Sequence, residues 1–194
     1  MAPASFTGGY EAMLTHAQKK MLIDMAKRAI HAELQGSSLH IPTISDPALM
    51  EHRGAFVTLK INGSLRGCIG IFVAAKPLIE VVADMAVQAA FHDPRFRPLT
   101  HDEFHRIHVE ISVLSPLREI SDIEEIEVGT HGIYLIKGTH HGVLLPQVAT
   151  EYGWDRHQFL DQTCIKAGLR PGCWKGPDAR ILIFSAEVFD ETSL

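Results

Sequence analysis

Residues 55–71 read AFVTLKINGSLRGCIGI, and this stretch decides the fold. Two runs rich in β-branched and other apolar residues flank the dipeptide Asn62-Gly63. Asn-Gly readily takes the positive φ angles of a two-residue type I′ turn, and β-branched residues favour strands. The stretch therefore predicts an antiparallel hairpin of residues 55–61 and 65–71, with Ser64 beginning the return strand.

The rest of the chain alternates helix and strand signals. Capping boxes stand at residues 15–18, 100–103 and 155–158. Helices are predicted over residues 15–34, 46–53, 77–92 and 155–167, and strands over residues 107–114, 133–136, 143–145 and 181–189. A second hairpin should join two of these strands around Gly138 and Gly142. Because no regular strand–helix–strand rhythm links the elements, we predict an α+β fold with a largely antiparallel sheet and flanking helices.

The composition excludes several classes of protein. The 194 residues are 46% hydrophobic and 21% charged, as in a globular domain. The net charge of −5 provides no basic surface, so we expect no nucleic acid partner. The longest apolar run, residues 78–91, contains Glu80, Asp84 and Gln88 and is too short to span a bilayer. The N-terminus shows no secretory signal pattern, so we expect no membrane association.

The cysteines bear on the compartment. Cys68, Cys164 and Cys173 are odd in number and widely spaced. A framework of disulfides usually shows an even number of cysteines. We therefore predict that no cysteine is disulfide-bonded and that the protein lies in the reducing cytoplasm.

Cys68 is the first candidate for chemistry. It follows Gly67 and stands two residues before Gly70, and both glycines let a ligand or another backbone approach closely. Strand alternation places Arg66 on the same face as Cys68. A guanidinium beside a thiol favours the thiolate, so Cys68 and Arg66 are candidate catalytic residues, and Gly67 and Gly70 are candidate binding residues.

A structural role competes with this interpretation. With a two-residue turn, Cys68 should lie opposite Val57, and Arg66 opposite Leu59, which is the pattern of a core face. A cysteine buried in apolar surroundings is inert. The local sequence leaves both interpretations open.

Three charged residues are further binding candidates. Asp93 and Arg95 flank a proline directly after the apolar run of residues 78–91. They could bind a carboxylate or orient the face of Cys68, or they could cap the helix and brace the loop. Glu110 lies on the polar side of a predicted strand, where it could act as a base or remain solvated.

Metal and cofactor sites are not expected. The chain has 12 histidines, including the adjacent His140 and His141, but it has no HExxH motif and no paired CxxC motif. The glycines of the first hairpin do not form a phosphate-binding fingerprint, because no helix follows at the required spacing. We therefore predict no bound metal and no cofactor.

Several stretches together carry a resemblance to a known family. They are RGAFVTL (53–59), LRGCIG (65–70), DPRF (93–96), EISVLSP (110–116) and LPQV (145–148), followed by Glu151 and Trp154. In this order they resemble the AMMECR domain family. We assign residues 14–190 to an AMMECR-like domain, residues 1–13 to a loose leader and residues 191–194 to a C-terminal tail.

The resemblance implies two unequal subdomains in one compact α+β unit. It implies no activity, because the family is broadly uncharacterised. In prokaryotes such domains are associated with Memo-like proteins and radical-SAM enzymes, so a protein of either kind is an expected partner.

Two functional classes follow. The first is an enzyme or enzyme subunit that uses Cys68 on a small substrate or in a protein-modification pathway. The second is a non-catalytic binding module or scaffold that recognises a partner through the LRGCIG hairpin. We favour the first. No serine stands in a Gly-x-Ser-x-Gly elbow, which argues against a hydrolase triad of that kind.

Overall fold

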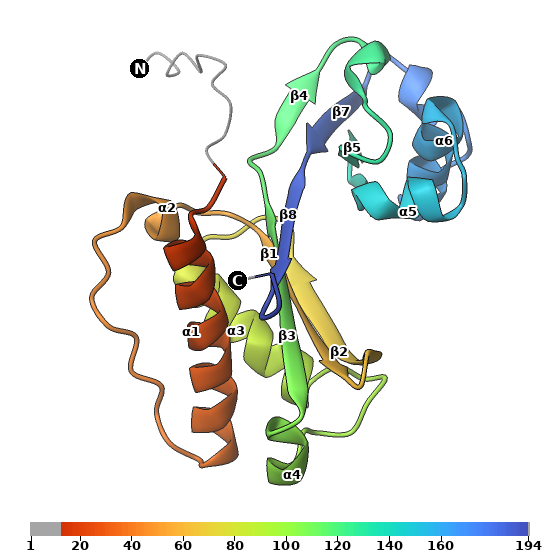
Figure 1. Cartoon of the computed structure of the whole chain (residues 1–194). Coiled ribbons are helices and arrows are strands. Elements are labelled where there is room, and N and C mark those ends of the chain that lie inside the picture. The colour runs from red at the N-terminus through yellow and green to blue at the C-terminus, as the bar shows by residue number, and fades with distance from the viewer. Residues whose placement is uncertain (1–12, 194) are drawn as a thin grey trace.

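The structure, a computed structural model, describes residues 13–193 (Figure 1). The helices are α1 (His16–Leu34), α2 (Pro47–Met50), α3 (Leu78–Phe91), α4 (His101–Phe104), α5 (Pro146–Glu151) and α6 (Arg156–Lys166), with 3₁₀ turns at Ile123–Glu125 and Cys173–Lys175. The strands are β1 (Ala55–Ile61), β2 (Ser64–Ile71), β3 (Ile107–Leu114), β4 (Arg118–Ile120), β5 (Gly132–Lys137), β6 (His140–Leu144), β7 (Ala179–Phe184) and β8 (Ala186–Asp190). All strand pairs within the two sheets are antiparallel, which confirms the predicted fold class. The predicted leader lies almost entirely outside the described residues.

The larger subdomain is a four-stranded sheet of order β2-β1-β3-β8 covered on one face by α1 and α3. Alternation along the strands sends most of their buried apolar residues toward these helices. The core between the layers includes Leu22, Met25, Ile30, Val57, Leu59, Val82, Ala86, Val109 and Ile111, all at most 2% exposed. Within residues 13–193, no helix is both long and apolar enough to cross a membrane.

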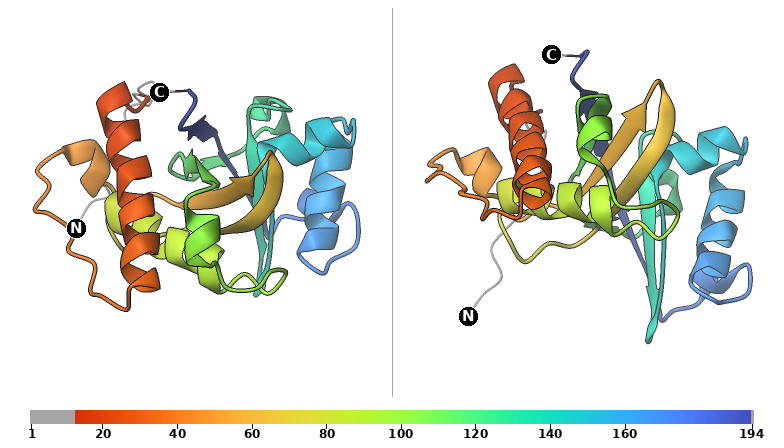
Figure 2. Two further views of the ribbon diagram at one scale, coloured as in Figure 1. Left: turned by 60° about the horizontal axis from the view of Figure 1, so that its bottom comes forward. Right: turned by 90° about the horizontal axis from the view of Figure 1, so that it is seen from below.

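The smaller subdomain is a second four-stranded sheet of order β4-β7-β5-β6, with α6 packed against β5 and β6. Its core gathers around Ile133, Phe159, Leu160 and Ile183. Figure 2 shows α1 and α3 at one end of the molecule and α5 and α6 at the other. The two unequal subdomains agree with the expectation from the family resemblance.

The predicted single strand over residues 181–189 is wrong. The chain breaks at Ser185, so that β7 belongs to the second sheet and β8 to the first. Ser115, which follows β3, bonds to Ser185 in both directions: Ser115 N donates to the Ser185 carbonyl, and Ser185 N donates to Ser115 Oγ, each at 2.9 Å. The chain passes from the first sheet to the second after β3, at Ser115, and returns at Ser185, so these two connections between the sheets lie side by side. Apolar residues on both sides of Ser185, at 181–184 and at 186, 188 and 189, hide this break from the sequence.

The predicted first hairpin is confirmed, and its turn has φ angles of 51° at Asn62 and 77° at Gly63. The predicted pairing inside it is wrong. A β-bulge beside Leu59 leaves Arg66 as the extra residue, so that Cys68 lies opposite Thr58 rather than Val57. A shift of one residue moves a side chain to the other face of a sheet. The bulge therefore takes Cys68 off the helix-covered face.

Smaller differences concern the second subdomain. The turn between β5 and β6 lies at Gly138, whereas Gly142 lies inside β6 opposite Leu135. An added Cβ at Gly142 would lie 2.3 Å from the Thr163 carbonyl oxygen of α6. That glycine therefore permits close helix–sheet packing, and the sequence alone did not distinguish this role from a turn.

The prediction that all cysteines are free is also wrong. Cys164 and Cys173 form a disulfide with a Cα–Cα distance of 5.9 Å. Gly168 and Gly172, both with positive φ, turn the chain back after α6 and return Cys173 to the buried Cys164. Because wide spacing did not prevent this bond, the cysteine pattern carries no argument for a reducing compartment.

We expect removal of this disulfide by Cys173→Ser to lower the free energy of unfolding by about 2 kcal/mol. The crosslink closes a short loop, so its effect on the unfolded chain lies at the low end of the usual range. Urea unfolding of the oxidised protein and of the variant measures the difference. Wild-type protein treated with a reductant should match the variant, and equal stability of oxidised and reduced wild type would contradict the bond.

Candidate functional site

Asp93 and Arg95 hold the backbone of Cys68 from outside the sheet. Strand β2 is an edge strand, so its outward N–H and carbonyl groups have no neighbouring strand. Asp93 Oδ2 accepts the Cys68 N–H at 2.9 Å, and Arg95 Nη2 donates to the Cys68 carbonyl at 3.1 Å. The pair therefore takes the place of a fifth strand at this one residue.

The Asp93 carboxylate is the fixed point of this arrangement. Its side chain is 1% exposed, and it accepts three bonds from Arg95: from the backbone N at 3.1 Å, from Nε at 2.9 Å and from Nη2 at 2.7 Å. The bonds from Arg95 are the main reason that the pKa of Asp93 lies well below its ordinary value, although burial opposes the shift. Asp93 is therefore ionised at neutral pH.

Arg95 carries a cation that bonds to the backbone of Cys68. The pKa of its guanidinium is raised mainly by the bond to Asp93, and Cys68 adds a smaller contribution in the same direction. The Arg95 side chain is 54% exposed. Solvent and ligands can therefore reach it, while Asp93 keeps it in place.

Arg66 makes a different set of contacts from the one we predicted. Its guanidinium forms two bonds of 2.9 Å to the carboxylate of Glu103, and a third of 2.9 Å to the carbonyl of Arg97. These bonds hold the pKa of Glu103 at about 2. The ring of Phe96 lies beside both Arg66 and Arg95, at 5.8 and 5.6 Å from their guanidinium carbons. Arg66 thus anchors the loop of residues 92–100 along the edge of β2.

Gly67 and Gly70, predicted as binding residues, both have packing roles. A Cβ at Gly67 would lie 2.1 Å from the Ala89 carbonyl oxygen, so Gly67 permits α3 to sit directly on β2. A Cβ at Gly70 would lie 2.2 Å from the Phe56 ring on the opposite face. Close approach of another part of the same chain explains both glycines.

The face of the first sheet away from the helices carries a row of polar side chains, which we call the polar face. Opposite one another across the four strands stand Cys68, Thr58, Glu110 and Asp190. Thr58 Oγ1 donates to Cys68 Sγ at 3.3 Å. Cys68 is half-buried and free, and the other two cysteines of the chain are disulfide-bonded.

An ion pair and a contact between a histidine and a carboxylate complete the polar face. Lys60 Nζ lies 2.7 Å from the carboxylate of Glu110, and His108 Nε2 lies 3.3 Å from that of Asp190. The four side chains are between 24% and 33% exposed. Glu110, a predicted binding residue, is thus brought into line with Cys68, with Thr58 between them.

Thr58, Lys60, His108 and Asp190 were not among the predicted site residues. A signal for three of them was present, because Thr58, Lys60 and His108 alternate with buried apolar residues along β1 and β3. The bulge hid the fact that Cys68 shares their face. Within residues 13–193, no group of three or more His, Cys, Asp or Glu side chains is placed to hold a metal ion.

Comparison with known proteins identifies the family. A sequence model of the AMMECR1 family matches residues 23–189, and the chain therefore belongs to that family. A protein of Methanothermobacter thermautotrophicus is 42% identical over 188 residues, covering 93% of this chain and 97% of that protein. Protein PF1979 of Pyrococcus furiosus is 42% identical over 183 residues, covering 89% of this chain and 87% of that protein.

A solved structure supports the fold. The crystal structure of the uncharacterized protein PH0010 from Pyrococcus horikoshii is similar with a TM-score of 0.75 and 40% sequence identity. The match covers 88% of this chain and 89% of that chain. The names of these relatives state no activity and no partner, so function has to be argued from the site.

Proposed function

We propose that the protein is an enzyme or enzyme subunit whose reactive group is the thiol of Cys68 on the polar face. The observation that carries this proposal is the bulge at Arg66, which takes Cys68 out of the core and places its sulfur beside the Thr58 hydroxyl. A hydroxyl donor and a nearby guanidinium both favour a thiolate over a thiol. Arg95, rather than the predicted Arg66, supplies the cation.

The substrate would meet charged groups of both signs next to the sulfur. Lys60 lies two residues beyond Thr58 on β1, Glu110 lies opposite Thr58 on β3, and Arg95 lies at the edge of the sheet. Such surroundings suit a polar small molecule or a modified protein side chain better than an apolar ligand. A Memo-like protein or a radical-SAM enzyme is the partner that the family resemblance favours.

A binding module is the second candidate, and one observation supports it. The bonds of Asp93 and Arg95 to the Cys68 backbone, together with the packing of Gly67 and Gly70, account for much of the LRGCIG segment without any chemistry. A rigid hairpin of this kind could present a surface to a partner protein. The reactivity of Cys68 separates the two candidates.

We expect iodoacetamide to label Cys68 in the folded protein near pH 7, and the Arg95→Gln variant to be labelled about fivefold more slowly. Arg95 bonds to the Cys68 carbonyl, and a neighbouring unit charge in largely aqueous surroundings changes the energy of an anion by about 1 kcal/mol, which corresponds to that factor. Mass spectrometry of the alkylated peptide gives the rate. Cys68→Ser should abolish labelling of the native protein.

Lys76→Gln is the matched control, because it removes one positive charge from an exposed pair with Asp84 on α3. Its labelling rate should equal that of the wild type. If Cys68 reacts only after the protein is unfolded in urea, the thiol mechanism is excluded and the binding module remains.

A further inference from the structure

We propose that the outer edge of β2 between Ile69 and Ile71 is a docking site for an extended segment of a partner protein in which apolar and basic residues alternate. The segment would add as a further strand to the first sheet. This proposal is independent of the chemistry of Cys68, because it concerns a different stretch of the edge.

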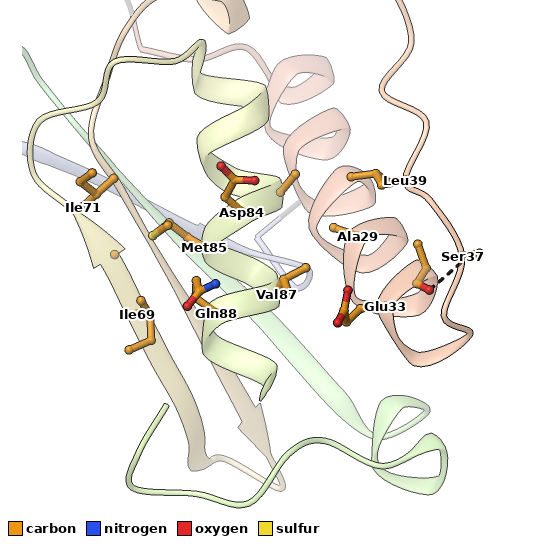
Figure 3. Close-up of a pocket in the computed structure, with 13 residues that line it drawn as sticks. Ala29, Glu33, Ser37, Leu39, Ile69, Ile71, Asp84, Met85, Val87 and Gln88 are labelled. Carbon is orange, nitrogen blue, oxygen red and sulfur yellow. Dashed lines mark hydrogen bonds between the residues drawn. The ribbon is translucent and has the colours of Figure 1, made fainter. Parts of the chain in front are cut away.

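A groove of about 690 Å³ lies along this edge and over α3 (Figure 3). Figure 3 shows Ile69 and Ile71 on β2 to one side of α3, and Ala29 and Glu33 on α1 with Leu39 on the other. Met85 and Gln88 lie on α3 between them. The lining is mainly apolar, and its polar residues are Glu33, Ser37, Asp84 and Gln88.

The backbone of Gly70 faces this groove with its hydrogen-bonding groups. Cys68 directs its N–H and carbonyl away from β1, where Asp93 and Arg95 bond to them. Because these directions alternate along a strand, Gly70 directs its own N–H and carbonyl outward as well. Among residues 13–193, no turn, loop or capping group bonds to the Gly70 backbone.

The edge lacks the features that usually protect edge strands. Natural proteins place lysine, proline or a bulge at such edges to prevent pairing with another chain. Here the sequence from 69 to 71 is Ile-Gly-Ile, and the nearest bulge lies back at Arg66. Ile71 is 39% exposed and Val73 is 62% exposed. An open, uncharged edge beside an apolar groove is the arrangement used in strand addition.

The charge of the groove indicates which kind of partner segment it would bind. Both charged residues that line the groove, Glu33 and Asp84, are acidic. Asp84 also pairs with Lys76, but the two side chains are 49% and 57% exposed, and an exposed ion pair of this kind contributes little. A segment that carries lysine or arginine between its apolar residues therefore matches the groove better than an acidic one.

The test uses two synthetic peptides, acetylated and amidated, in which valine alternates with lysine or with glutamate over seven residues. Isothermal titration at low ionic strength should show the valine–lysine peptide binding at least about tenfold more tightly, and the preference should shrink as salt is added. Equal affinities, or no heat with either peptide, would overturn the proposal.

Hydrogen exchange of the Gly70 amide distinguishes strand addition from other modes of binding. The valine–lysine peptide should slow exchange of this amide at least about tenfold, because its N–H gains an acceptor. Binding without protection at Gly70 would mean that the peptide occupies the helix side of the groove, and would overturn strand addition.

A pair of variants gives a second readout. Ile71→Lys places a charge on the edge and should weaken binding of the valine–lysine peptide by about tenfold or more. Val188→Lys makes the same kind of change at a 54% exposed position on β8, the other edge strand of the sheet, and should leave binding unchanged. Because exchange at Gly70 is measured on the wild type, the proposal stays testable even if Ile71→Lys does not fold.

Discussion

Replacing Asp93 with asparagine should lower the free energy of unfolding by about 3 kcal/mol at pH 7, measured by urea denaturation. The carboxylate accepts bonds from Cys68 N and from three nitrogen atoms of Arg95, and its side chain is 1% exposed. Asparagine has nearly the same shape, but one of its two terminal atoms is a donor. The amide nitrogen of the asparagine would therefore face an N–H group, which would be left without an acceptor. Hydrogen bonds to charged groups contribute about 1.5–3 kcal/mol each.

Glu119→Gln is the matched control for this substitution. Glu119 forms a bidentate pair with Arg180, at 3.0 and 2.7 Å, but the two side chains are 48% and 57% exposed. Solvent screens such a pair, so we expect a much smaller loss of stability than for Asp93→Asn. Equal losses in the two variants would mean that burial of Asp93 does not determine its contribution.

The pH dependence of the Asp93 variant follows from the direction of its pKa shift. The pKa of Asp93 in the folded protein lies well below the value of 3.8 expected in the unfolded chain. Its stabilising contribution is therefore fully present above about pH 4 and is lost as the pH falls toward the folded pKa. The difference in stability between wild type and Asp93→Asn should narrow below pH 4. A constant difference down to pH 2 would contradict this assignment.

Local signals predicted much of the fold. The Asn62-Gly63 turn and the capping boxes at Thr15, Thr100 and Asp155 all appear in the structure, because each depends on residues within three positions of one another. The strand at residues 107–114 likewise followed from simple alternation. These features do not depend on distant parts of the chain.

The features that sequence analysis missed depend on contacts between distant residues. The bulge at Arg66 could not be read from LRGCIG alone, because the groups that hold Arg66 lie in a distant part of the chain. Arg66 donates hydrogen bonds to the Glu103 carboxylate and to the Arg97 carbonyl, which lie 37 and 31 residues further along the chain. The face on which Cys68 lies depends on this bulge. Alternation alone therefore paired Cys68 with Val57, whereas it lies opposite Thr58.

The sequence indicated the rigid loop around Asp93 but left the role of Asp93 open. The prolines on either side of this loop indicated that it is irregular and rigid, and bracing was one of the two roles considered for Asp93 and Arg95. Orienting the face of Cys68 was also considered, and the bond from the Cys68 N–H to Asp93, 25 residues away, agrees with that role; which backbone groups are bonded could not be read from the loop itself. The disulfide was missed for the same reason, because only the turn after α6 brings Cys173 back to Cys164.

We expect Gly67→Ala to be at least as damaging as the loss of Asp93, with a decrease of about 3 kcal/mol or more in the free energy of unfolding. An added Cβ would lie 2.1 Å from the carbonyl oxygen and 3.1 Å from the carbonyl carbon of Ala89. Both contacts are with backbone, so no side chain can rotate away and α3 has to move as a unit. Overpacking of this kind usually costs about 1–3 kcal/mol, and the rigid neighbour places this case at the upper end.

Gly176→Ala separates steric clash from the general effect of replacing glycine. A Cβ at Gly176 would also come close to other atoms, at 2.5 Å from Lys137 Nζ and 2.9 Å from Asp178 Oδ1, but these are the ends of flexible side chains. Its φ of −73° suits alanine, so we expect a change below about 1 kcal/mol. Similar losses in the two variants would show that α3 can shift easily on β2. Since α3 also forms part of the groove beside Gly70, such mobility would weaken the case for a preformed docking edge as well.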